Sequence, residues 1–282
     1  MSAALPPIRN IPIFDGHNDT LLALHLPEFS EGHERAFFTQ SEHGHIDLPR
    51  ALAGGMGGGF FAIFTPSPSS QDAPMPGGSG QTTSYAIPIA AEVDQSVALK
   101  FTVDLAADLF RIEREGKGKL KVVRNVAEMA QCLADGTFAM IFHIEGAEAI
   151  DTDLNALETL YQAGLRSIGI VWSRPNIFAS GVPFAFPSSP DTGPGLTEAG
   201  KRLVKACNEL GILVDLSHLN EKGFWDVAKL SDAPLVATHS GAHALCASAR
   251  NLTDKQLDAV RASGGMVGVN FHVGFLRADG KR

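Results

Sequence analysis

The stretch Phe138-Ala139-Met140-Ile141-Phe142-His143-Ile144-Glu145-Gly146 is a nearly unbroken apolar run that ends in a carboxylate and a glycine. Such a run is typical of a strand in a parallel sheet whose two faces are both covered by helices. A carboxylate at the end of a buried strand is costly unless it is paired or bound to a metal ion. We therefore expect Glu145 to lie at the carboxyl end of a core strand, beside a cation.

Apolar segments of the same kind recur along the chain and alternate with amphipathic segments of helical period. Strands are predicted over residues 11–16, 59–64, 138–144, 167–172, 212–216, 235–238 and 266–271, with a short one over 120–123. Helices are predicted over residues 48–52, 85–115, 126–134, 154–163, 197–210, 221–230 and 254–262. Residues 65–83 and 174–194 are rich in Pro and are expected to form loops, the first of them mobile. The alternation of strands and helices predicts an α/β protein built on a parallel barrel.

The predicted barrel falls short of closure. A closed (β/α)8 TIM-like barrel has eight strands, whereas this sequence shows seven principal strands before it ends at Arg282. The length of 282 residues suits one barrel or two small domains. We expect residues 1–282 to form a single, incomplete barrel domain that lacks the eighth strand and the last helix.

The composition argues against several other classes of protein. The net charge is −8, the isoelectric point is about 5.7 and no Lys/Arg-rich run is present, so nucleic-acid binding is not expected. The sequence contains no run of about 18 apolar residues, so no membrane-spanning helix is predicted. Residues 1–10 lack the pattern of a signal peptide. Cys132, Cys207 and Cys246 are too few and too dispersed for a disulfide framework or a thiolate zinc site. A cytoplasmic protein is predicted.

Four further potential metal ligands follow predicted strands. His17 and Asp19 come after the first strand and are two residues apart, so an extended segment would project both to the same side. His218 and His239 stand at equivalent ends of two consecutive strands. Imidazole and carboxylate suit zinc and similar divalent ions. Because the carboxyl ends of barrel strands converge on one face, these four residues and Glu145 predict a metal site there.

Each candidate residue also has a simpler explanation. Asp19 could serve a turn or the start of a helix, and a lone histidine after a strand is usually a hydrogen-bonded core residue. We expect His143 to be packed inside the barrel rather than to bind a metal. Arg250, in the loop after the strand that ends near His239, could hold a substrate carboxylate through two parallel hydrogen bonds. It could equally be a surface arginine near the cap of the next helix.

Five short motifs, taken in their order and spacing, resemble the membrane (renal) dipeptidases, which are zinc exopeptidases on a (β/α)8 barrel of the metal-dependent hydrolase type. The resemblance covers essentially the whole chain. The motifs are Asp15-Gly16-His17-Asn18-Asp19, Ile144-Glu145-Gly146, Asp215-Leu216-Ser217-His218, Thr238-His239-Ser240 and Arg250-Asn251-Leu252-Thr253-Asp254.

The resemblance implies a function and a role for each ligand. It implies that His17 and Asp19 hold one zinc ion, that His218 and His239 hold a second, and that Glu145 bridges the two. Water activated by the two ions would then hydrolyse the peptide bond of a small dipeptide, whose free carboxylate Arg250 would bind. We expect a dipeptide as the substrate, and a homodimer is compatible with the sequence.

The sequence departs from the family pattern in two places. Family members commonly carry a histidine after the fourth strand that contacts the scissile carbonyl, and the aligned residue here is Trp172, as in a bacterial subgroup. The family also carries an aspartate on the eighth strand, which this chain does not reach. Two alternatives therefore stay open at this point. One is another amide or cyclic-amide hydrolase, or a deaminase, on the same barrel, and the other is an inactive metal-binding fragment.

Overall fold

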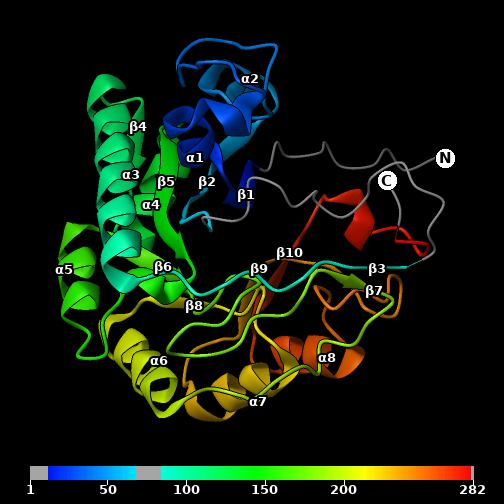
Figure 1. Cartoon of the computed structure of the whole chain (residues 1–282). Coiled ribbons are helices and arrows are strands. Elements are labelled where there is room, and N and C mark those ends of the chain that lie inside the picture. The colour runs from blue at the N-terminus through cyan, green and yellow to red at the C-terminus, as the bar shows by residue number, and fades with distance from the viewer. Residues whose placement is uncertain (1–11, 68–83, 281–282) are drawn as a thin grey trace, which may run out of the picture.

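A curved sheet of parallel strands forms the centre of the molecule (Figure 1). The computed structural model describes residues 12–67 and 84–280. Along the sheet the strands follow the order β1 (Ile13–Asn18), β2 (Met56–Phe64), β5 (Phe138–Glu145), β6 (Leu165–Gly169), β8 (Leu213–Asp215), β9 (Val236–Ser240) and β10 (Met266–Val269). The short strand β4 (Leu120–Val122) pairs with β5 beside this path. These are the seven principal strands and the one short strand that the sequence predicts.

The sheet curls until its first strand approaches its last ones. A Cβ atom at Gly16 of β1 would collide with the backbone carbonyl of Thr238 in β9. Only a residue without a side chain permits so close an approach of two backbones. The result is a nearly closed barrel of parallel strands, which confirms the predicted α/β, TIM-like fold class.

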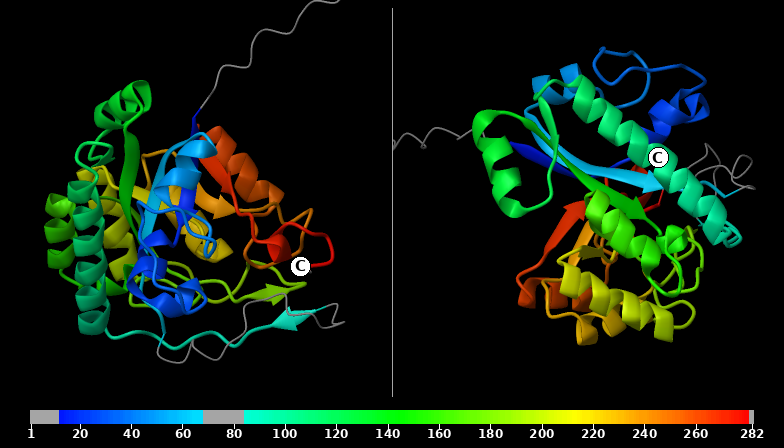
Figure 2. Two further views of the ribbon diagram at one scale, coloured as in Figure 1. Left: turned by 90° about the horizontal axis from the view of Figure 1, so that it is seen from above. Right: turned by 90° about the vertical axis from the view of Figure 1, so that its left-hand side faces the viewer.

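The helices lie on the outside of the curved sheet, as two further views show (Figure 2). They are α1 (Thr20–His25), α2 (Leu48–Ala53), α3 (Gln95–Glu115), α4 (Val126–Asp135), α5 (Asn155–Ala163), α6 (Glu198–Leu210), α7 (Glu221–Leu230) and α8 (Asp254–Ala262). Six of them begin at a polar side chain that accepts a hydrogen bond from the first turn, namely Asp47, Asp94, Asn125, Thr197, Asn220 and Thr253. Such caps satisfy backbone N–H groups that have no partner inside the helix. Among the described residues, no helix is both long and apolar enough to cross a membrane.

Some predicted boundaries are wrong, and the largest error concerns the helix expected over residues 85–115. The helix α3 begins at Gln95, while Tyr85 and Ala86 form the short strand β3. This strand pairs antiparallel with β7 (Ala185–Phe186), which lies inside the loop predicted over 174–194. Pro88 disfavours a helix through this region because it lacks a backbone donor, and Asp94 caps the helix that follows.

Smaller shifts affect most of the strands, and β1 at Ile13–Asn18 includes His17, which was expected to follow it. The strand predicted over 167–172 is β6 at Leu165–Gly169, and the strand predicted over 59–64 already begins at Met56. β9 continues to Ser240, so that His239 lies within the strand instead of after it. Residue 11 and most of the loop predicted over 65–83 lie outside the described residues.

The core positions the carboxyl ends of the strands at one level. Phe142 and Ile144 of β5 are fully buried, and both belong to the main hydrophobic core. Glu145, the next residue in that strand, stands opposite Phe64 of β2 on one side and Gly169 of β6 on the other. The end of β5 is thereby fixed in register with its two neighbours, which places the Glu145 carboxylate at the mouth of the barrel.

Candidate metal and active site

The side chain of Glu145 lies at the centre of a group of three histidines. Its Oε1 atom is 3.0 Å from Nε2 of His218 and 3.1 Å from Nε2 of His239. The same oxygen is 3.8 Å from Nε2 of His17. All four side chains are largely buried, and that of Glu145 is 6% exposed. One carboxylate oxygen therefore faces three imidazole nitrogens in a small, shielded volume.

Three strands and one turn bring these side chains together. His17 lies in β1, His239 lies in β9 and Glu145 is the last residue of β5. His218 follows shortly after β8 and has a φ of 66°, in the left-handed region. Residues with a side chain rarely adopt this conformation, and where they do it is often at a functional site.

Asp19 is the outermost of the predicted ligands. Its Oδ1 atom is 3.5 Å from Nε2 of His17, and its side chain is 55% exposed. Asp19 occupies the N-cap position of α1 but makes no side-chain hydrogen bond to that helix. Its carboxylate is therefore not engaged as a helix cap, which argues against the simpler explanation of this residue.

The donor atoms suit a divalent metal ion. One atom each from His17, Glu145 and His239 can be chosen so that all three lie within 4.8 Å of one another. Imidazole nitrogens combined with a carboxylate oxygen are ligands that zinc takes in catalytic sites. A buried carboxylate also requires compensation by positive charge. The residues present therefore fit the metal centre that the sequence predicts.

Two of the histidines are neutral over the physiological pH range. Burial, aided by the positive charge of Arg250, lowers the pKa of His218 to about 4. Burial, together with the nearby His17, lowers the pKa of His239 to about 3. A neutral imidazole has a nitrogen lone pair that a metal ion can use.

His17 and Glu145 form the charged part of the site. Burial opposes a charge on His17, but the carboxylates of Glu145 and Asp19 outweigh burial and raise the pKa of His17 to about 10. Burial would likewise raise the pKa of Glu145, yet the adjacent His17 and His218 hold that pKa well below its usual value. In the metal-free protein, a proton on His17 thus supplies the positive charge that balances Glu145.

Arg250 is a buried residue of this site, so the surface-arginine alternative is wrong. It is 3% exposed, and its Nη2 atom donates to the backbone carbonyl of His239 at 3.1 Å. Its Nη1 atom lies 3.5 Å from Oγ of Ser240, and its buried Nε atom has no partner among the described residues. Burial lowers the pKa of Arg250 to about 10, so the guanidinium is still charged at neutral pH.

Trp172, which stands where family members commonly have a histidine, lies beside the site. Its ring centroid is 4.7 Å from that of Phe64, 5.4 Å from that of Phe184 and 6.1 Å from that of His218. The Arg174 guanidinium lies 5.5 Å from the Trp172 ring. These neighbours hold the indole as an apolar wall next to a predicted ligand, where it cannot act as an acid or a base.

His143 is packed inside the barrel, as expected, and its side chain is fully buried. Its Nδ1 atom is 2.9 Å from Oγ of Ser167, while Nε2 has no hydrogen-bond partner among the described residues. Burial lowers the pKa of His143 to about 4, which keeps the ring neutral.

Polar residues that the sequence does not reveal as part of the site orient two of the histidines. Nδ1 of His218 is 2.8 Å from Oγ of Ser173, and Nδ1 of His239 is 2.9 Å from Oγ1 of Thr238. The Thr238 hydroxyl in turn contacts the buried carboxylate of Asp215. The sequence signal that could have found them is a polar residue inside or directly after an apolar strand. Such a residue needs a hydrogen-bond partner when it is buried.

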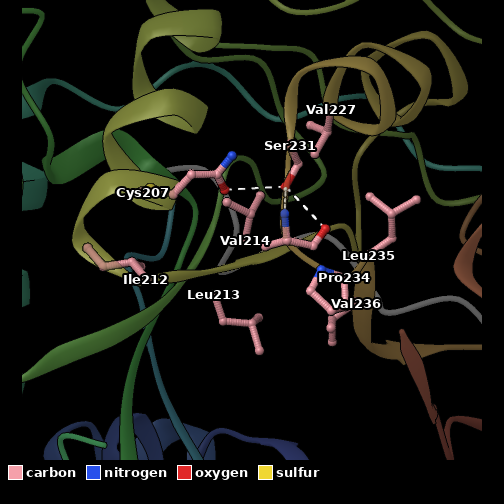
Figure 3. Close-up of a pocket in the computed structure, with 12 residues that line it drawn as sticks. Cys207, Ile212, Leu213, Val214, Val227, Ser231, Pro234, Leu235 and Val236 are labelled. Carbon is pink, nitrogen blue, oxygen red and sulfur yellow. Dashed lines mark hydrogen bonds between the residues drawn. The ribbon is translucent and has the colours of Figure 1, made fainter. Parts of the chain in front are cut away.

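A separate cavity lies between α6, α7 and the amino ends of β8 and β9 (Figure 3). It has a volume of about 290 Å³, and most of the residues around it are apolar, including Leu213, Val227 and Leu235. Burial raises the pKa of Cys207, the titratable residue in its wall, to about 12. This cavity lies at the opposite ends of the strands from Glu145 and is separate from the candidate site.

A parallel α/β barrel with buried imidazoles and a carboxylate at the carboxyl ends of its strands defines the class of metal-dependent hydrolases. The chain belongs to the membrane dipeptidase family (peptidase family M19), whose family model matches residues 3–281. The predicted resemblance is therefore confirmed, and the protein is a metallopeptidase of the dipeptidase type.

Similar proteins support this membership. One is a metallopeptidase from Rhodobacter sphaeroides, whose structure was solved with a phosphinate mimic of the dipeptide L-Ala-D-Ala. Its sequence is 50% identical to this chain, and the two structures match with a TM-score of 0.86 over 96% of this chain and 77% of the other. The structure of dipeptidase AC, a metallopeptidase, is 51% identical with a TM-score of 0.86, over 97% and 76% of the two chains. An uncharacterised protein encoded in the PQQ-III 3′ region of Acinetobacter calcoaceticus is 42% identical over 274 residues, which are 97% of this chain and 84% of that protein.

Proposed function

We propose that this protein is a zinc dipeptidase that hydrolyses the peptide bond of small dipeptides with the help of two metal ions. The observation that carries the proposal is the position of the Glu145 carboxylate, with one oxygen 3.0–3.8 Å from three imidazole nitrogens. A single carboxylate in that position is suited to serve two ions at once. Membership in a metallopeptidase family supports the same reading.

The proposed ligands divide into two pairs around Glu145. His17 and Asp19, whose facing atoms are 3.5 Å apart, would hold one ion. His218 and His239, whose Nε2 atoms are 3.1 Å apart, would hold the other. When bound, zinc supplies Lewis acidity and lowers the pKa of water from about 16 to about 7.

The chain itself contributes orientation and the exclusion of water. Glu145 is the proposed catalytic residue, because its ionised carboxylate lies where the reacting groups would meet and can accept a hydrogen bond from the attacking water. Trp172 and Phe184 form an apolar wall beside His218, which would limit access of bulk water to that side.

Arg250 is the proposed substrate-binding residue. A guanidinium has five N–H donors, and the hydrogen bonds to the His239 carbonyl and to Ser240 occupy one donor each. The remaining donors can hold a carboxylate in a bidentate manner. A fixed anion-binding group so close to the predicted ligands favours a substrate whose free carboxylate is near its scissile bond, as in a dipeptide. The phosphinate dipeptide mimic bound to the Rhodobacter sphaeroides metallopeptidase supports the same substrate class.

The proposal is tested by measuring bound zinc and dipeptide hydrolysis on the same preparation of the full chain. We expect two zinc ions per chain and turnover of dipeptides in preference to lactams and nucleobases. Removal of the metal with a chelator should abolish hydrolysis, and added zinc should restore it. Zinc binding without hydrolysis of any dipeptide in a broad panel would refute the proposed activity.

A further inference from the structure

A chain of two short hydrogen bonds leads from a buried carboxylate to one of the proposed ligands. The hydroxyl of Thr238 donates to Oδ2 of Asp215 at 2.6 Å. The same hydroxyl oxygen is 2.9 Å from Nδ1 of His239. All three side chains are buried, and Asp215 is 1% exposed.

The surroundings of Asp215 make it an acceptor at both of its oxygens. Its Oδ1 atom accepts backbone N–H groups of Thr238 at 2.8 Å and of Ser217 at 3.0 Å. Its Oδ2 atom accepts the Thr238 hydroxyl. Three donors therefore converge on this carboxylate, and hydrogen bonds to the charged form favour its ionised state.

The direction of the second hydrogen bond follows from the first. A hydroxyl has one proton to donate, and the proton of Thr238 goes to Asp215. The Thr238 oxygen can therefore only accept from His239, which requires a proton on Nδ1 of that imidazole. A neutral imidazole with its proton on Nδ1 has its lone pair on Nε2, the atom that lies 3.1 Å from Glu145.

His218, the other histidine of this pair, has no comparable group in the described part of the chain that fixes the position of its proton. Nδ1 of His218 faces the hydroxyl of Ser173 at 2.8 Å, and among the described residues no carboxylate hydrogen-bonds to that serine. A serine hydroxyl can rotate, so it can donate to the imidazole or accept from it. A proton on Nε2 of His218 would be shared between Nε2 of His239 at 3.1 Å and Oε1 of Glu145 at 3.0 Å, with His239 as an acceptor.

A competing influence comes from Glu145, whose oxygen would favour a proton on Nε2 of His239. Glu145 has another donor, however, since Nε2 of His218 is 3.0 Å from its Oε1 atom, and Nε2 of His17 lies 3.8 Å from the same oxygen. Within residues 12–67 and 84–280, the Oδ2 atom of Asp215 has no donor other than the Thr238 hydroxyl, and the rings of His143 and His239 are more distant, at 3.9 Å and 3.8 Å.

The backbone holds Thr238 in place for this task. A Cβ atom at Gly16 in β1 or at Gly268 in β10 would collide with the Thr238 carbonyl. The Thr238 carbonyl is therefore enclosed between the backbones of β1 and β10.

We propose that Asp215 and Thr238 are positioning residues, which keep the proton of His239 on Nδ1 and so leave Nε2 free to bind a metal ion. The inference rests on the proposed function, because it takes His239 as a ligand. Carboxylates and hydroxyls behind a metal-binding histidine commonly orient the ring in this way, and their loss weakens metal binding about 10–100-fold.

The test compares Thr238→Val with Thr238→Ser. Valine keeps the shape of threonine without the hydroxyl, whereas serine keeps the hydroxyl.

Two quantities are measured. Zinc affinity is determined by competition with a chromophoric chelator. The tautomer of His239 is determined by ¹⁵N NMR of the metal-free protein, with His239→Gln to assign the signals. We expect zinc affinity to fall about 10–100-fold in Thr238→Val and to stay close to that of the unaltered protein in Thr238→Ser. We also expect the His239 proton on Nδ1 in the unaltered chain and in Thr238→Ser.

The possible results separate the two proposals. If the unaltered protein binds no zinc, the proposed function fails, whereas the NMR measurement still decides where the His239 proton lies. If the protein binds zinc but the proton lies on Nε2 in its metal-free form, the inference is overturned. It is also overturned if both Thr238 variants bind zinc equally well. If circular dichroism shows that Thr238→Val does not fold, the His239 tautomer in the unaltered protein and in Thr238→Ser still decides whether the inference holds.

Discussion

The imidazole rings of His17 and His239 stack on each other, with ring centroids 4.0 Å apart and an angle of 29° between the rings. His17 belongs to the first strand of the barrel and His239 to the next-to-last strand along the sheet. The stack is made possible by Gly16, which lets the backbone of β1 approach Thr238. The nearly closed form of the barrel is therefore also what assembles the site.

The first prediction concerns this close approach. Gly16→Ala should push β1 away from β9, because the new methyl group would meet the Thr238 carbonyl. Overpacking of this kind should lower the free energy of unfolding by about 1–3 kcal/mol, as measured by denaturant titration, and should also weaken zinc binding. Gly54→Ala is the matched control, since a Cβ atom there meets only ordinary contacts. Equal stability of the two variants would contradict the proposed role of Gly16.

The second prediction concerns Glu145. Glu145→Gln keeps the size of the side chain but removes the charge that the three histidines surround. We expect the variant to lose stoichiometric zinc and to hydrolyse dipeptides about a hundredfold more slowly or worse. Metal analysis and initial rates check both effects, with the exposed Glu158→Gln as the control. Survival of full zinc content together with full activity would show that Glu145 is not a ligand.

The third prediction concerns Arg250. Arg250→Ala should raise KM for dipeptides about 10–100-fold, because a charged hydrogen-bonded pair contributes roughly 1.5–3 kcal/mol. Arg250→Lys should recover only part of this loss, since an ammonium group lacks the two parallel donors. The comparison substrates are dipeptide amides, which have no free carboxylate. If KM rises equally for dipeptides and for their amides, Arg250 does not bind the carboxylate.

The fourth prediction concerns protons released on metal binding. In the metal-free protein the pKa of His17 is raised to about 10, so this ring is protonated at pH 8 and must lose its proton to become a ligand. Calorimetric titration with zinc at pH 8, in two buffers of different ionisation enthalpy, gives the number of protons released. We expect at least about one proton per chain, and fewer in His17→Gln. Binding without proton release would mean that His17 is neutral or is not a ligand.

The fifth prediction concerns the stability of the metal-free protein in acid. Burial lowers the pKa of His143 from 6.5 to about 4 in the folded state, so between these values the unfolded chain binds a proton that the folded chain does not. Linkage then makes the folded state less stable as pH falls from about 6.5 to about 4, with no such effect above 6.5. Denaturant unfolding at several pH values measures the slope, which His143→Gln should reduce. An unchanged slope in this variant would exclude the contribution of His143.

Much of the fold and of the site could be predicted from the sequence, because the signals are local. The run before Glu145 is apolar over consecutive residues, so strand β5 and its end were recognisable without any neighbour. His17, His218 and His239 could be grouped because each follows or ends such a run, and barrel strands share one face at their carboxyl ends. The helix predicted from Tyr85 was wrong because the pairing of β3 with β7 is not visible in either segment alone.

The amino-acid sequence by itself determined the strands, the family and the set of residues able to hold a metal, since these depend on residue types and on short spacings. Only the tertiary structure decided that Arg250 is buried, that Asp215 reaches His239 through Thr238, and that His17 stacks on a ring from a distant strand. Each of these relationships joins segments that are remote in the chain or depends on hydrogen-bond direction. They arise from the packing of strands and loops against one another in three dimensions, which no local pattern encodes.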